Sequence, residues 1–346
     1  MTSAGRQHCW RSRRRLAEVK WTRLRAASLG WLIATVLVGC HRNHEQSAVH
    51  PASSEAASIA TLWWVMFAVL TAVFVIVMAL TYVAISRGQT GRNVPGGPGR
   101  FVVISGIVVP SIILVGLLIY SLQTTLTLRR PTEGRVIQIT GFQWWWEVRY
   151  PELGIVTANE IYLPAGEPVW LELRAKDVVH SFWVPNLHGK VDLLPETVNR
   201  FWVRADKPGH WRGQCAEFCG KQHALMALRV VALPPDEYSA WEARHRRPHP
   251  VSTSPELRRG EDVFFRASCH VCHRVRDTRA DGRIGPDLTH IGTRLTLGAG
   301  SIENTRAHLA KWILEPQVVK PGSLMPHTPL SRAELELLLD YLQSLR

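Results

Sequence analysis

The chain has few acidic residues and few sulfur-containing ones. Its 346 residues include 28 Asp and Glu against 41 Lys and Arg, and only six Cys and five Met. A net charge of +13 would suit nucleic-acid binding, but residues 1–39 hold eight Lys or Arg and one acidic residue, so more than half of the excess lies there. We therefore expect no nucleic-acid partner. The 46% hydrophobic and 20% charged residues also exclude a disordered or fibrous chain.

The N-terminal segment has the layout of a bacterial export signal. Basic residues up to Arg25 precede the apolar segment 26–39, which is too short to span a bilayer and is followed by Cys40. Residues 37–40 resemble a lipoprotein box. We expect a signal peptide over 1–39, lipidation of Cys40, and a lipidated N-terminal segment over 40–55. The alternative is a chance Cys after a small residue.

Two long runs lack charge altogether. Residues 56–86 and 101–128 each exceed the roughly 20 residues that a membrane helix needs. The loop between them contains three Arg and no acidic residue, so the positive-inside rule puts this loop in the cytoplasm. The sequence thus predicts a multi-pass protein of the bacterial inner (cell) membrane, with everything after Arg129 on its periplasmic or outer face.

The middle of the external region has the pattern of short strands. Residues 169–175, 201–205 and 226–233 alternate with period two, and Gly and Pro punctuate the joins. This pattern predicts a small all-β sandwich over 130–235. The polar, Pro-containing segment 236–254 is expected to be a linker.

Beyond the expected linker the periodicity becomes helical. Residues 261–267, 302–314 and 331–345 are predicted helices, and Ser331 is in position to cap the last one. The segment 255–346 is therefore predicted to be an all-α domain.

A twelve-residue segment concentrates soft metal ligands. It supplies Cys215, Cys219, His223 and Met226, a set suited to copper. A structural zinc site would use four Cys or His ligands and no Met. A mononuclear blue-copper site would use only one Cys. This segment has two Cys, and two thiolates are enough to bridge two coppers. The second His must come from elsewhere, and His180 follows a hydrophobic strand stretch. The alternatives are a disulfide or buried thiol pair, and core packing for the Met.

A second Cys pair lies in a haem-attachment motif. Cys269-His270-Val271-Cys272-His273 has the form that tethers a c-type haem through two thioethers, with His273 as the proximal iron ligand. Met325 is the expected sixth ligand, which would suit electron transfer. A zinc site would lack a fourth ligand of matching spacing. Weaker candidates for the sixth ligand of the haem iron are His290, His308 and His327.

These motifs together resemble a known family. The loop Cys-x-Glu-x-Cys-Gly-x-x-His-x-x-Met, with His-Ser-Phe-Trp-Val-Pro at 180–185 and Gly-Phe-Gln-Trp-Trp-Trp at 141–146, is similar to subunit II of haem-copper cytochrome c oxidases. Residues 255–346 look like a class I cytochrome c, so the whole resembles the caa-type arrangement with a fused C-terminal cytochrome c domain. The resemblance implies a multidomain chain with a two-helix transmembrane hairpin, an all-β cupredoxin-like sandwich and an all-α class I cytochrome c domain.

The resemblance also implies roles for individual residues. Cys215 and Cys219 would bridge the two coppers of a dinuclear CuA centre. His180 would bind one copper and His223 the other. Met226 and the main-chain carbonyl of Glu217 would complete the ligands, and the Glu217 carboxylate would help to hold a Mg²⁺ shared with subunit I. Trp144 matches the aromatic residue where electrons enter, the alternative being a core or membrane-interface aromatic.

The function implied by the resemblance is transfer of electrons within a respiratory terminal oxidase. Electrons would pass from covalent haem c to CuA and on to the haem-copper subunit I, which reduces oxygen to water, so no residue of this chain is expected to be catalytic. Further oxidase subunits are expected partners, and a soluble or membrane cytochrome or a quinol-oxidising complex is the expected donor.

Other classes of function stay open at the level of sequence. A CuA-containing nitric oxide reductase is one, because Val103 stands where family members often carry a Glu in the second span. A membrane-anchored copper chaperone, which would have a thioredoxin-like fold, and a stand-alone cytochrome shuttle are the others.

Overall fold

The computed structural model describes residues 44–87, 97–127, 131–247 and 254–346. The expected signal peptide 1–39 and Cys40 lie outside the described residues and stay predictions. Glu45–Arg346 form one compact unit, which carries the helices and strands discussed below.

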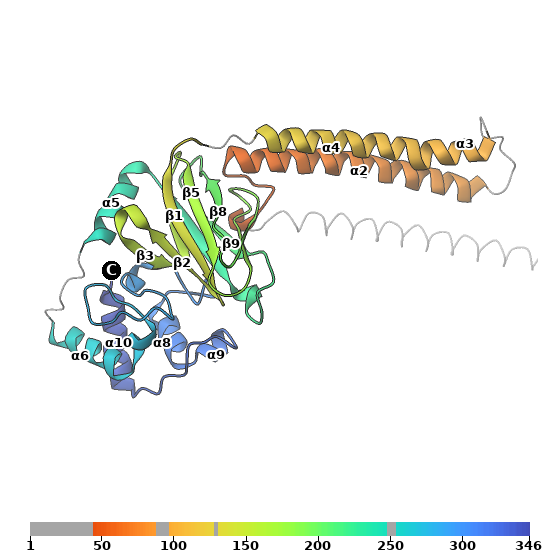
Figure 1. Cartoon of the computed structure of the whole chain (residues 1–346). Coiled ribbons are helices and arrows are strands. Elements are labelled where there is room, and N and C mark those ends of the chain that lie inside the picture. Colours follow the sequence, from red (N-terminus) through yellow and green to blue (C-terminus); the bar gives the residue numbers. More distant parts are fainter. Residues whose placement is uncertain (1–43, 88–96, 128–130, 248–253) are drawn as a thin grey trace, which may run out of the picture. The chain divides into compact units, whose positions relative to one another are not determined.

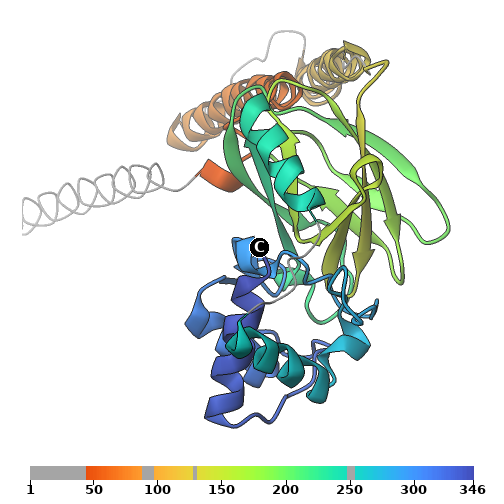
Figure 2. The same cartoon turned by 90° about the vertical axis from the view of Figure 1, so that its left-hand side faces the viewer.

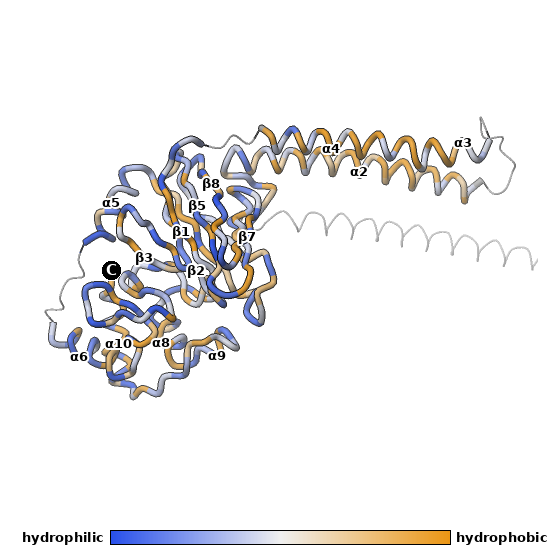
Figure 3. The backbone as a smooth tube through the Cα atoms, viewed as in Figure 1, coloured by the Kyte–Doolittle hydropathy of each residue, from blue (hydrophilic) through white to orange (hydrophobic). Residues whose placement is uncertain are grey.

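Two long apolar helices precede the external region. The first is α2 (Ser54–Arg87), and the second runs through α3 (Gly97–Val103), the π-helical turn η2 (Ile104–Val108) and α4 (Val109–Thr127). Pro110 has no N–H to bond the carbonyl four residues earlier, which accounts for the widened turn directly before it. α2 and α4 contact each other, and Figure 3 shows apolar residues along both. Both are long and apolar enough to cross a membrane.

Two five-stranded sheets form the sandwich (Figure 1). The first has the order β3-β2-β1-β5-β8 and the second β4-β10-β9-β6-β7, with β1 pairing parallel to β5 and β10 parallel to β4. The strands are β1 (Arg135–Phe142), β2 (Trp145–Tyr150), β3 (Ile155–Ala158), β4 (Glu160–Pro164), β5 (Val169–Ala175), β6 (His180–Trp183), β7 (Val191–Leu193), β8 (Asn199–Val203), β9 (Gly209–Cys215) and β10 (Ala227–Leu233).

The core of the sandwich follows the period-two pattern of the sequence. Alternate residues of β1 and β5, among them Ile137, Ile139, Leu171 and Leu173, are fully buried between the sheets. The predicted strand at 169–175 agrees with β5 residue for residue. Short 3-10 turns complete this part of the chain: η1 (His44–Gln46), η3 (Pro151–Leu153) and η4 (His223–Leu225).

The segment expected to be a linker begins with a helix instead. α5 (Pro235–Arg246) lies against β4 and β10 (Figures 1 and 2). It buries Tyr238, Trp241 and His245, and the Trp241 ring stacks on Tyr162 with centroids 4.9 Å apart. The linker prediction was wrong for these residues because the three aromatic rings occupy one face at helical spacing, despite the polar residues between them.

The C-terminal domain is mainly helical. Its elements are α6 (Pro255–Arg266), α7 (Cys269–Cys272), η5 (Ile291–Thr293), β11 (Thr296–Leu297), β12 (Ile302–Glu303), α8 (Arg306–Leu314), α9 (Pro316–Val319) and α10 (Arg332–Ser344). α6 packs on α10 at Gly260, where a Cβ would lie 2.2 Å from the carbonyl oxygen of Leu337. Ser331 caps α10 in a capping box with Glu334, as predicted. The predicted helix at 302–314 begins only at Arg306, because Ile302–Glu303 pairs with β11.

These elements agree with the predicted architecture: two apolar helices, a two-sheet β-sandwich and a mainly helical C-terminal domain.

Candidate metal and haem sites

Four elements converge on a buried cluster of sulfur and imidazole groups at one end of the sandwich. His180 begins β6 and Cys215 ends β9, while Cys219 lies in the loop that follows β9. The ligand atoms of these three buried residues lie within 4.8 Å of one another. His223 and Met226, in and directly after η4, bring their Nδ1 and Sδ atoms to 3.7 and 3.8 Å from the Cys219 Sγ.

The two cysteines are free thiols in contact, and not a disulfide. Their Sγ atoms are 3.8 Å apart, far beyond the roughly 2.05 Å of a disulfide bond. The Glu217 carbonyl oxygen lies 3.2 Å from the Cys215 Sγ. The structure thus brings together all six residues that the sequence suggested for copper, including the main-chain carbonyl.

Two glycines make room for this cluster. A Cβ at Gly141 would lie 2.8 Å from the ring of His180, so the strand β1 can pass close to the imidazole only without a side chain there. Gly220 has φ +110°, and a Cβ there would lie 3.2 Å from the Trp144 ring. Both glycines belong to the motifs singled out in the sequence.

The hydrogen bonds of His180 orient its ring. Nε2 lies 2.8 Å from Oδ1 of Asp177, and Nδ1 faces the Cys215 Sγ at 3.9 Å. Burial lowers the pKa of His180, but the hydrogen bonds with Cys215 and Asp177 outweigh it and raise this pKa overall. A carboxylate behind the imidazole is the usual support of a metal-binding His. Sequence reasoning missed Asp177, although its place three residues before His180 was a usable signal.

The thiols titrate as a pair. The hydrogen bond from the Cys219 thiol lowers the pKa of Cys215 far below its ordinary value, and the same contact raises the pKa of Cys219. A soft cation that bound both sulfur atoms would displace their protons. The donor set of two thiols, two imidazoles and a thioether fits copper, and its two sulfur atoms suit a bridged pair.

The second site is a cavity of about 480 Å³, within the roughly 300–1,000 Å³ of cofactor sites. It is lined by Cys269, Cys272, His273 and Met325 of the C-terminal domain and also by Trp144 of the sandwich. We call it the His273 cavity. The lining therefore contains the attachment motif, the expected sixth ligand and the residue where electrons were expected to enter.

The local structure holds His273 ready to bind a metal. Its Nδ1 lies 2.8 Å from the Pro286 carbonyl, which leaves Nε2 free, and burial lowers the pKa of His273, so the imidazole is neutral. A Cβ at Gly285 would lie 2.6 Å from this ring. The residues present therefore fit a covalently attached haem.

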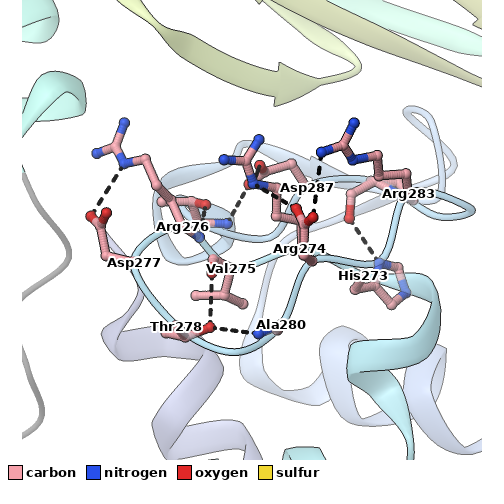
Figure 4. A network of polar contacts seen from close by, with 12 residues as sticks. His273, Arg274, Val275, Arg276, Asp277, Thr278, Ala280, Arg283 and Asp287 are labelled. Carbon is pink, nitrogen blue, oxygen red and sulfur yellow. Dashed lines mark hydrogen bonds and ion pairs between the residues drawn. The ribbon is translucent and has the colours of Figure 1, made fainter.

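Hydrogen bonds and ion pairs stabilise the loop after His273 (Figure 4). Arg274 reaches the carboxylates of Asp281 and Asp287 at 3.6 and 3.9 Å, and the Thr278 hydroxyl donates to the Val275 carbonyl at 2.8 Å. These contacts fix the loop that leads back to Gly285 and so hold the His273 ring in place.

The four candidates for the sixth ligand, Met325 and three histidines, lie in different surroundings. Of the described residues, those lining the His273 cavity include Met325 but none of His290, His308 and His327. His308 and His327 are engaged with the carbonyls of Glu303 and Leu314. His290 is buried against the ring of His245, with centroids 4.3 Å apart. The cavity thus favours Met325 among the four.

Trp144 lies between the two sites. Its indole Nε1 donates a 2.8 Å hydrogen bond to the Cys219 carbonyl, and its side chain lines the His273 cavity. The Gln143 amide donates to the same carbonyl at 2.8 Å. Sequence reasoning missed Gln143 and also Lys320, whose buried amine donates to the Trp144 carbonyl at 2.6 Å.

The fold and the two sites define a membrane-anchored protein that combines a cupredoxin-like domain with a cytochrome c domain. The family model for the periplasmic domain of cytochrome c oxidase subunit II matches residues 154–233, and the cytochrome c model matches residues 257–346. Cytochrome c oxidase subunit 2 of Alkalihalophilus pseudofirmus is 34% identical over 325 residues, covering 90% of this chain and 94% of the relative.

Another relative and one solved structure are also similar to this chain. Cytochrome c oxidase subunit 2 of Bacillus sp. (strain PS3) is 36% identical over 260 residues, covering 69% of this chain and 72% of the relative. The periplasmic domain of subunit II of cytochrome oxidase from Bradyrhizobium japonicum, a crystal structure, is 28% identical, with a TM-score of 0.33 over 34% of this chain and 96% of its own.

The chain belongs to the cytochrome c oxidase subunit II family and is a component of an oxidoreductase complex. The copper-chaperone alternative is wrong, because it required a thioredoxin-like fold and the ligand cluster lies on a β-sandwich.

Proposed function

We propose that electrons enter a respiratory terminal oxidase through this chain. They pass from a covalently bound haem c to a dinuclear CuA centre, and on to the haem-copper subunit I, where oxygen is reduced to water. The observation that carries the proposal is the position of Trp144. One side chain lines the His273 cavity and also donates a hydrogen bond to Cys219, the residue at the centre of the ligand cluster.

The two metal groups would supply the one-electron chemistry at either end of this contact. Cys269 and Cys272 would hold the porphyrin, and His273 and Met325 would ligate its iron. Cys215 and Cys219 would bridge the coppers, with His180, His223, Met226 and the Glu217 carbonyl as the remaining ligands.

The chain's own residues keep both sites rigid. Asp177 fixes the ring of His180, and the Pro286 carbonyl fixes that of His273. The cluster of sulfur atoms is buried, with Cys215 1% and Met226 0% exposed, so little water needs to reorganise around it. Such preorganisation is what a site that changes only its charge requires.

Glu217 has a second proposed role. Its carbonyl points at Cys215, and the carboxylate of this half-buried residue would help to hold a Mg²⁺ shared with subunit I. A carboxylate oxygen is a ligand that Mg²⁺ prefers. Removal of the carboxylate in Glu217→Gln should therefore lower the magnesium content of the complex and leave the copper content unchanged, because the carbonyl is retained.

The proposed location is the bacterial inner membrane, with the copper and haem domains on the periplasmic or outer face. The apolar helices α2 and α4 support this, as does the Arg-rich loop between the two spans. A signal peptide over 1–39 and lipidation of Cys40 would add an anchor. Mass spectrometry of the mature N-terminus tests both, and an unmodified Cys40 would contradict lipidation.

The external donor is proposed to be a soluble or membrane cytochrome or a quinol-oxidising complex. Its electron would go first to the haem, because the tether keeps the cytochrome c domain at a high effective concentration near the copper domain. Subunit I and further oxidase subunits are the proposed permanent partners.

The experiment is metal analysis and gas consumption by the purified complex. We expect two coppers and one c-type haem per chain in addition to the haem and copper of subunit I, with oxygen consumed when a reduced donor is added. One copper, or no covalent haem, would contradict the proposal.

Consumption of nitric oxide in place of oxygen would favour the alternative, a CuA-containing nitric oxide reductase. Val103 is the observation behind it, because the second span has no carboxylate anywhere over 101–128.

A further inference from the structure

Lys320 is a buried lysine in the C-terminal domain, and burial lowers the pKa of its amine to about 7. Only 3% of the residue is exposed. Its Nζ donates to three main-chain carbonyls: those of Trp144 at 2.6 Å, Leu225 at 2.9 Å and Gly298 at 3.0 Å. An ammonium group has three N–H donors, and a buried one is tolerated only when they are satisfied. The three carbonyls therefore form a complete cage for this side chain.

The cage is built by both domains. Lys320 and Gly298 belong to the cytochrome c domain, whereas Trp144 and Leu225 belong to the sandwich. Trp144 is the residue that donates to the Cys219 carbonyl, and Leu225 directly precedes Met226. One side chain thus ties the cytochrome c domain to two segments that adjoin the candidate copper ligands.

Other contacts in the same region hold main chain against main chain. The amide of Ala227 donates to the Ala299 carbonyl at 2.9 Å. Oε1 of the buried Glu160 accepts from the amides of Leu295 and Thr296 at 2.6 and 3.1 Å. A Cβ at Gly300 would lie 2.9 Å from the Cβ of Ala227, so the two backbones approach closely. These amides report directly on whether the two domains are in contact.

We infer that Lys320 is a positioning residue that keeps the cytochrome c domain docked on the copper domain with Trp144 in the wall of the His273 cavity. The inference rests on the proposed function for its consequence, because docking matters only if electrons cross this contact. Lys320 also lines the His273 cavity, and it reaches the copper domain through the carbonyls of Trp144 and Leu225.

The first test is hydrogen exchange of the full chain, compared between wild type, Lys320→Met and Lys311→Met. Lys311 is a matched control, because it is an exposed lysine of the same domain. Lys320→Met leaves three carbonyls without their charged donor, so the docked fraction should fall and exchange at Ala227, Leu295 and Thr296 should rise about tenfold. Lys311→Met should leave these amides unchanged. Unchanged protection in Lys320→Met would overturn the inference.

A purely structural role is distinguished by where exchange rises. If Lys320 only stabilised its own domain, exchange would rise in α10 and not selectively at the three interface amides, and this result would also overturn the inference. Lys320→Arg is the second variant. It keeps the charge but places a larger, planar group in the cage. We therefore expect the exchange rate of the interface amides to lie between the rates in the wild type and in Lys320→Met.

The second test measures transfer in the intact complex after flash reduction of the haem. Copper reduction should slow about tenfold in Lys320→Met, with haem and copper spectra and metal content unchanged. An unchanged rate in Lys320→Met, with increased interface exchange, would overturn the positioning role. Absence of haem-to-copper transfer in the wild type would instead refute the proposed function, and the exchange experiment would still decide whether Lys320 docks the domains.

Discussion

The indole N–H of Trp144 donates to the main-chain carbonyl of Cys219 at 2.8 Å, while the same side chain lines the cavity that holds His273. Trp144 is thus in contact with both sites at once. Gly220 permits the approach, because any larger residue there would meet the indole ring.

The contact predicts that Trp144→Phe slows electron transfer without disturbing either site. Phe keeps an aromatic ring in the cavity wall but has no N–H, so the hydrogen bond to Cys219 is lost. Loss of a bond worth ~1 kcal/mol in this contact should slow copper reduction by roughly fivefold. Time-resolved absorbance of the purified complex measures the rate.

Trp170→Phe is the control for this variant, because Trp170 lies on β5 and does not line the His273 cavity. Its rate should equal that of the wild type. Equal rates for all three proteins would remove Trp144 from the route.

The proposed copper ligands predict a graded response to substitution. Cys219→Ser exchanges a soft thiolate for a hydroxyl that copper binds poorly, so the mixed-valence near-infrared band should disappear and the copper content should fall. Met226→Leu keeps both thiolates and should retain two coppers with a shifted spectrum. Optical and EPR spectra with metal analysis make the comparison, and an unaltered near-infrared band in Cys219→Ser would exclude a thiolate-bridged pair.

Met325→Leu separates haem attachment from iron ligation. Both thioether links should remain, because the cysteines are untouched. The reduction potential should fall by on the order of 0.1 V, a part of the ~0.8 V over which axial ligands tune haem. Redox titration checks the shift. The substitutions His290→Asn, His308→Asn and His327→Asn should leave the potential unchanged, and a fall in any one of them would identify that histidine as the sixth ligand instead.

The buried pair His245 and His290 predicts a loss of stability in acid. Burial lowers the pKa of His245 to about 4, with further lowering by His290, Arg244 and Arg276. The unfolded chain, with a His pKa of about 6.5, takes up a proton first as the pH falls, so stability present above pH ~6.5 is lost down to pH ~4. We expect His245 to account for about 3 kcal/mol of this loss.

Thermal unfolding between pH 7 and 4 tests this prediction with two variants. His245→Phe keeps a ring against Trp241 but cannot be protonated, so its melting temperature should fall less steeply with pH than that of the wild type. His210→Phe, at an exposed position of β9, should follow the wild type. Parallel curves for all three proteins would contradict the assignment.

Local patterns in the sequence predicted the features that depend on neighbouring residues. The alternation of β5 and the capping Ser331 of α10 are set within a few residues, and both are as predicted. The proposed copper loop is also local in sequence, because four of its candidate ligand residues lie within twelve positions.

Features that depend on distant partners were not predicted. α5 was mistaken for a linker because charged residues separate its three aromatic rings in the sequence, and the rings pack on partners that lie on the sandwich. No local pattern in the sequence distinguishes Lys320, because only the fold brings three carbonyls around its amine. Asp177 also gained its role only when its carboxylate reached the ring of His180.

The most direct test of the account is the concentration dependence of copper reduction after flash reduction of the haem in the purified complex. If the electron crosses within one chain, haem reoxidation and copper reduction should have the same rate, and this rate should stay constant as the complex is diluted tenfold. A rate that falls in proportion to dilution, or haem reoxidation without copper reduction, would contradict transfer between the two sites of one chain.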